Sequence, residues 1–103
     1  MIFFGKLVHD KIPEMIQANG EIPEFERLNE ERYLEELDKK LNEEVKEYQE
    51  SKEADELADI VEVVYAICEA KGISVEQLQE IREKKKVLRG GFSERYFLIC
   101  KKQ

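Results

Sequence analysis

Two pairs of carboxylates are the residues in this chain whose types and spacing could do chemistry. They are Glu44 with Glu47 and Glu56 with Asp59, in the stretch LNEEVKEYQESKEADELADIVEVV at residues 41–64. Three residues advance about 4.5 Å along a helix and stay on one face, so each pair would present two carboxylates together. An all-oxygen cluster of this kind suits Mg²⁺, with Mn²⁺ as an alternative.

The short segment between the two pairs, residues 51–53, is the part of this stretch least committed to helix. It predicts a reversal into an antiparallel helical hairpin. With the turn centred between its first two residues, the pairs lie at equal distances from that centre. We therefore expect Glu47 to face Glu56 and Glu44 to face Asp59. Four carboxylates so close would repel one another, and a divalent cation would remove that repulsion.

Glu44 also interrupts an apolar stripe. In the first helix of the hairpin, apolar side chains recur in steps of three and four at Leu34, Leu37, Leu41 and Tyr48, and position 44 is the missing member. A carboxylate on a core-facing stripe is costly unless it is neutralised or ligated. A lone pair of acids would usually be a solvated surface in a chain that is 40% charged. The matched register and the place of Glu44 favour a metal site instead.

Capping residues mark the helices before the turn. Asp10 is suited to cap a short helix that ends at residues 19–20, an Asn-Gly pair. Asn29 is suited to cap the long helix that runs to about Glu50.

Capping signals also mark the helices after the turn. A third helix is expected from residue 53 or 54 to residues 71–72, and Ser74 with Gln77 predicts a capping box for a fourth. We therefore expect residues 1–103 to form one all-α domain, an antiparallel bundle of about four helices.

The two ends of the chain differ from the rest. Residues 2–8 and 95–100 look extended and could pair as a small two-stranded β element. Cys68 lies on an apolar helix face and predicts a buried thiol. With Cys100 and a single histidine it offers no zinc-ligand spacing.

The formal net charge of −7 argues against binding to nucleic acid or to an anionic membrane. The apolar run at residues 1–4 is too short for a signal or a membrane segment, so a cytoplasmic location is expected.

Basic side chains are gathered near the start and in the last quarter of the chain. Lys85 stands where the apolar stripe of the fourth helix predicts another apolar residue. It either snorkels outward from the edge of that stripe or points at a phosphate. The candidates for substrate binding are Lys6, Asp10, Lys11, Lys85, Arg89 and Arg95.

Three motifs carry a resemblance over nearly the whole chain. They are KLVHDKIPE at residues 6–14, EEVKE with ELAD at residues 43–47 and 56–59, and RGGF at residues 89–92. The sequence resembles the MazG-like all-α nucleoside triphosphate pyrophosphohydrolases, and within them the phosphoribosyl-ATP pyrophosphohydrolase-like branch. It departs from that branch at His9, where arginine is usual, and in a shorter gap between the acidic pairs.

The resemblance implies Mg²⁺ at the positions of the two acidic pairs and an obligate oligomer, a homodimer or a tetramer. It implies cleavage between the α- and β-phosphates of a nucleoside triphosphate, with house-cleaning of non-standard nucleotides as one role. We expect Glu47 to orient or deprotonate the attacking water. Phosphoribosyl-ATP itself is an alternative substrate. The rival class is a non-catalytic helical oligomerisation or regulatory module, whose apolar stripes would only build an interface.

Overall fold

The computed structural model describes residues 1–103 and contains four helices. They are α1 (Ile12–Ala18), α2 (Glu30–Ser51), α3 (Ala54–Ala70) and α4 (Val75–Arg89). No strand forms anywhere in the chain. The predicted all-α class and the number of helices are confirmed.

None of the four helices combines the length and the apolar character that crossing a membrane requires.

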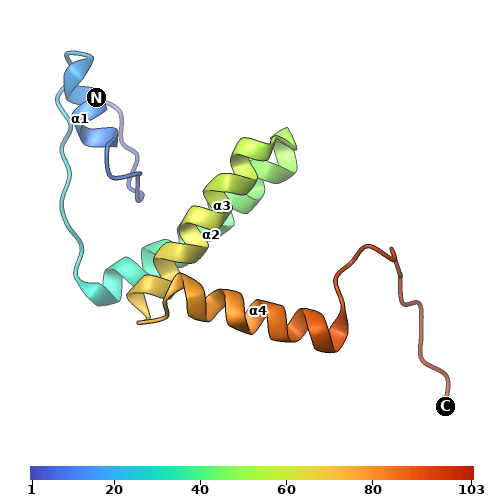
Figure 1. Cartoon of the computed structure of the whole chain (residues 1–103). Coiled ribbons are helices and arrows are strands. Elements are labelled where there is room, and N and C mark those ends of the chain that lie inside the picture. Colours follow the sequence, from blue (N-terminus) through green and yellow to red (C-terminus); the bar gives the residue numbers. More distant parts are fainter.

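The centre of the molecule is the hairpin of α2 and α3, which lie side by side along most of their lengths (Figure 1). The chain reverses in two residues. Lys52 adopts a left-handed conformation with φ of 61°, and Glu53 is the extended residue that precedes α3. The amide of Glu53 donates to Oγ of Ser51 at 3.1 Å, which closes the turn. The hairpin predicted from the sequence therefore forms, with its turn centred one residue later than expected.

Side-chain caps fix where two of the helices begin. The Asn29 carboxamide oxygen accepts from the amide of Arg32 at 2.9 Å at the start of α2. At the start of α4, Ser74 and Gln77 exchange the two hydrogen bonds of a capping box, at 3.1 and 2.8 Å. Both predicted caps are confirmed, and each satisfies amides that the helix leaves without partners.

The predicted cap of α1 by Asp10 is wrong. The residue that precedes α1 is Lys11, and no side chain caps this helix. The amide of Ile12 donates to the carbonyl of His9 at 3.0 Å instead, and Pro13 in the first turn has no amide to satisfy. A backbone turn thus replaces the carboxylate that the sequence suggested.

The core is small and lies in the contact between α2 and α3. Four residues are buried: Leu37 and Glu44 of α2, and Val63 and Cys68 of α3. The buried thiol of Cys68 agrees with its predicted place on an apolar face. One of the four positions belongs to a carboxylate, which ties the core directly to the candidate site.

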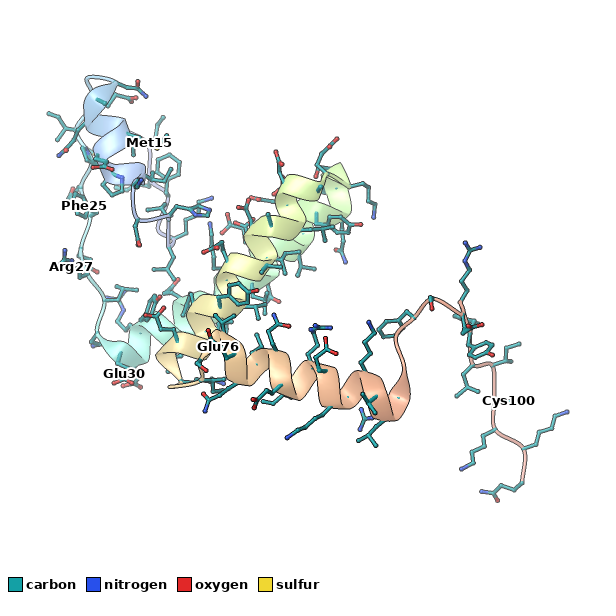
Figure 2. The ribbon with its side chains drawn as sticks, in the orientation of Figure 1. Met15, Phe25, Arg27, Glu30, Glu76 and Cys100 are labelled. Carbon is teal, nitrogen blue, oxygen red and sulfur yellow. The ribbon has the colours of Figure 1, made fainter.

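The other two helices stand away from the hairpin (Figure 1). α4 contacts α3 only weakly and leaves Ile81 50% and Leu88 83% exposed. α1 is joined to α2 by an extended connection from which Phe25 and Arg27 project (Figure 2), and Phe25 is 64% exposed. The apolar stripe predicted on the fourth helix is therefore present, but beyond the half-buried Leu78 it stays exposed.

The predicted β element is also absent. Residues 2–8 and 95–100 are irregular and lie at opposite ends of the molecule (Figure 1). Phe3 and Phe97 are 87% and 89% exposed, so the aromatic side chains of these segments do not pack on a helix. Two strands without an apolar surface to cover are marginal in water. Residues that favour an extended backbone were therefore not enough to form the predicted β element.

The caps can be tested by matched substitutions. Asn29→Ala should lower the free energy of unfolding by about 1 kcal/mol, because it removes the side-chain acceptor for α2. Asp10→Ala should leave it unchanged within about 0.5 kcal/mol, because Asp10 accepts no capping bond. Urea unfolding followed by circular dichroism measures both, and an equal loss in the two variants would contradict the assignment of the caps.

Candidate metal centre

Three of the four predicted ligands meet in one cluster. Glu44 of α2 and Glu56 with Asp59 of α3 each offer a carboxylate oxygen, and these oxygens lie within 4.8 Å of one another. We call these three residues the acidic trio. A second group on α2 joins Glu43, Glu44 and Glu47 within the same limit. Glu44 belongs to both groups, so all four predicted ligands gather around it.

Glu44 is the most constrained of these residues. It is only 4% exposed, and its Oε1 lies 3.3 Å from Nζ of Lys40. Its other oxygen, Oε2, is buried and has no hydrogen-bond partner. An unsatisfied buried acceptor costs about 1–3 kcal/mol, and more when it is charged. This oxygen marks a position at which a cation would stabilise the fold.

The pKa values of two carboxylates in the cluster are raised by the same crowding and burial. Burial raises the pKa of Glu44 above its ordinary value, and the charge of Glu47 adds to the rise, while Lys40 opposes both. Loss of solvent also raises the pKa of Glu56, with further contributions from Glu47 and Asp59. The carboxylates that face each other therefore disfavour their charged forms. A bound divalent cation would reverse that preference.

The segment before α1 reaches the same part of the hairpin. Nζ of Lys6 donates to Oε1 of Glu43 at 2.6 Å. This hydrogen bond raises the pKa of Lys6, which also lies in the field of Glu47 and Glu44. Burial works to raise the pKa of Glu43, but its contacts with Lys6 and Lys40 prevail and lower it. Lys6 is thus the one predicted substrate-binding residue that makes a direct contact with the acidic hairpin.

A residue that the sequence analysis did not select stands beside the acidic trio. Nε2 of His9 lies 3.5 Å from Oδ1 of Asp59. The signal that could have identified it was its position, since it lies in the KLVHDKIPE motif, which already contained three candidate residues, Lys6, Asp10 and Lys11.

The remaining basic candidates do not reach the cluster. Lys11, Lys85, Arg89 and Arg95 are exposed and form no ion pair, and Asp10 is exposed as well. α3 extends about 16 Å beyond Asp59 before it ends. α4 then leads away from the hairpin (Figure 1). Within a single chain, the structure does not bring these side chains and the carboxylates together.

The residues present fit a hard divalent cation. The donors are carboxylate oxygens from two helices, one of them buried and without a partner. Oxygen donors match Mg²⁺ and Mn²⁺ better than metals that favour nitrogen or sulfur. Glu44, Glu56 and Asp59 would hold such an ion, with Glu47 at the edge of the cluster.

Comparison with known proteins adds little to this geometry. No protein-family model matches the chain, and no solved structure matches it. Over 43 residues the chain is 46% identical to a protein of Mycolicibacterium smegmatis that is described as uncharacterized. That match covers 42% of this chain and 44% of the relative, so it spans less than half of either protein.

The raised pKa of Glu44 predicts how its replacement acts without metal. At pH 7 the fold must hold a charged carboxylate that it disfavours, and this penalty disappears below the ordinary value of 4.5. Glu44→Gln should therefore raise the melting temperature of the EDTA-treated protein at pH 7, and the gain should shrink as the pH falls toward 4.5.

The matched control is Glu62→Gln, which removes an exposed acid from α3. It should shift the melting temperature little, and by the same amount at both pH values. A loss of stability in Glu44→Gln at pH 7 would contradict the prediction, because it would mean that the ion pair with Lys40 outweighs the cost of burial.

Proposed function

We propose that this protein is a metal-dependent nucleotide pyrophosphohydrolase. It would cleave a nucleoside triphosphate between the α- and β-phosphates to give a nucleoside monophosphate and pyrophosphate. The observation that carries the proposal is the buried, unpartnered oxygen of Glu44 within the acidic trio. A purely structural hairpin has no need for a charged acceptor at a core position.

The motif resemblance supports the same proposal. The acidic trio and Glu47 occupy the motif positions that would bind Mg²⁺ in the MazG-like pyrophosphohydrolases. Membership of that family, and of its phosphoribosyl-ATP pyrophosphohydrolase-like branch, is part of the proposal. Phosphoribosyl-ATP itself and non-standard nucleoside triphosphates are its two candidate substrate classes.

Each residue has a role in the proposed reaction. A bound Mg²⁺ would screen the phosphate charges, orient the substrate and lower the pKa of a water. Glu47, half-buried beside Glu44 and Glu56, would orient that water or accept its proton. Lys6 would exchange its hydrogen bond with Glu43 for one to a phosphate oxygen, where its charge stabilises the developing negative charge.

The chain would act as a homodimer or a tetramer. Its accessible surface of 9795 Å² exceeds by about 3,700 Å² what a compact monomer of its mass exposes. Its radius of gyration is 18.2 Å, against about 13 Å for a compact domain of this length. An excess of this size is larger than the share of one partner in a standard interface, about 800 Å². A second copy that covers α4 would supply the missing burial.

The same exposed surface supports the rival proposal, a helical module that only oligomerises. The two proposals differ in the role of the carboxylates. A non-catalytic module should melt at the same temperature with and without Mg²⁺. A metal-dependent enzyme should gain stability, because the ion binds the native state alone.

Turnover is the direct test. The purified protein should release pyrophosphate and a monophosphate from at least one member of a panel of standard and modified nucleoside triphosphates and phosphoribosyl-ATP, and only with Mg²⁺ or Mn²⁺. Glu44→Gln should lower kcat at least about 100-fold, because it removes a metal ligand. Glu62→Gln removes the same negative charge from an exposed position, and this variant should retain activity.

Several results would overturn the proposal. Release of inorganic phosphate instead of pyrophosphate would show that the bond cleaved is not the one between the α- and β-phosphates. Full activity in Glu44→Gln would show that the reaction does not depend on the acidic trio. If no substrate in the panel is hydrolysed and Mg²⁺ does not change the melting temperature, the non-catalytic oligomerisation module is the better description.

Oligomerisation has its own test. Sedimentation equilibrium should report a dimer or a tetramer at micromolar concentration. The double variant Ile81→Glu with Leu88→Glu should dissociate it, because two charges would enter the apolar face of α4. Gln79→Glu, on the same helix, is the control for added charge and should stay assembled. A monomeric native protein would contradict the prediction.

A further inference from the structure

The chain contains a single histidine, and it lies beside Asp59, one member of the acidic trio. Nε2 of His9 is 3.5 Å from Oδ1 of Asp59 and makes no hydrogen bond with it. This separation is at the outer limit for a hydrogen bond. Two atoms that bind one cation at about 2.1 Å each are typically about 3 to 4 Å apart. The spacing therefore suits a pair of ligands better than a pair of hydrogen-bonding groups.

Two attachments hold His9 in this place. Its carbonyl accepts from the amide of Ile12 at 3.0 Å, which fixes it at the start of α1. Three residues earlier, Lys6 is tied to Glu43 of α2 at 2.6 Å. The backbone on both sides of His9 is thus held, and its imidazole, 56% exposed, must turn past Asp59 to reach an ion at the centre of the trio.

The trio itself has capacity for another donor. It supplies three carboxylates, and the buried Oε2 of Glu44 indicates that a ligand belongs at their centre. We propose that His9 is a direct ligand of the cation held by Glu44, Glu56 and Asp59. This inference rests on the proposed metal-dependent function and specifies which ion that site selects.

A nitrogen donor changes the preference of the site. Mg²⁺ strongly favours oxygen ligands, whereas Mn²⁺ and the later divalent metals accept imidazole with rising affinity. The site therefore selects Mn²⁺ over Mg²⁺ more strongly than carboxylates alone would.

The alternative source of the contact is an ion pair between a protonated His9 and Asp59. Such a pair would be displaced when a cation binds, and the imidazole would then lie outside the metal's ligand shell. A measurement of which nitrogen atoms touch the metal separates the two arrangements.

Pulsed electron paramagnetic resonance of the Mn²⁺-loaded protein makes that measurement. The protein is prepared without a polyhistidine tag, so His9 is its only imidazole. We expect a ¹⁴N modulation typical of directly bound imidazole. It should change to the ¹⁵N pattern when the protein is grown with [¹⁵N]histidine, a label that leaves the fold untouched.

Two negative results are distinguishable. Mn²⁺ that binds without imidazole modulation would overturn the role of His9 while leaving the metal centre of the proposed function in place. Failure of the protein to bind Mn²⁺ at all, seen as an undiminished spectrum of the free aqueous ion, would overturn both.

Affinities give a second, independent readout. Loss of an outer-shell partner already weakens metal binding about 10–100-fold, so His9→Gln should weaken Mn²⁺ binding at least about tenfold. Its effect on Mg²⁺ should be smaller than threefold on the same scale. Gln17→Ala, an exposed change in the helix that follows His9, should affect neither ion by more than about threefold. An equal loss for both ions in His9→Gln would contradict a selecting nitrogen ligand.

Discussion

The burial of Glu44 between α2 and α3 is the constraint on which the rest of the structure depends. Helical periodicity places this carboxylate on the stripe that packs the hairpin, where an apolar residue would stabilise the fold more. Lys40 satisfies one of its oxygens, and nothing in the chain satisfies the other. The hairpin thus gives up part of its small core to hold a charge in place. That cost makes sense where the charge serves binding.

The hairpin, its apolar stripes and the carboxylates that meet across it could be predicted from the sequence, because all three follow from local periodicity. A carboxylate that replaces a stripe residue must be buried wherever the stripe is, and Glu44 is. The caps at Asn29 and Ser74 were equally accessible, since a cap involves residues only three positions apart. These features need no knowledge of distant parts of the chain.

Most of the predictions that failed depend on contacts between distant parts of the chain. Pairing of the two end segments needed them to meet, and the structure leaves them at opposite ends of the molecule (Figure 1). Asp10 has the composition of a cap, but a backbone turn ending at Ile12 takes its place. Lys85 lies on a real apolar stripe, yet α4 carries that stripe away from the hairpin. His9 was passed over because its relation to Asp59 depends on where the segment before α1 meets the hairpin, which no local pattern encodes.

The two-residue turn at Lys52 and Glu53 restricts how this site can change in evolution. One residue inserted between Glu47 and the turn would rotate the carboxylates of α2 by about 100° relative to those of α3. Insertions and deletions near the turn are therefore tolerated only when they shift both helices by matched fractions of a turn. The distance along the chain between the acidic pairs should vary among relatives in discrete steps, while the loop itself stays short.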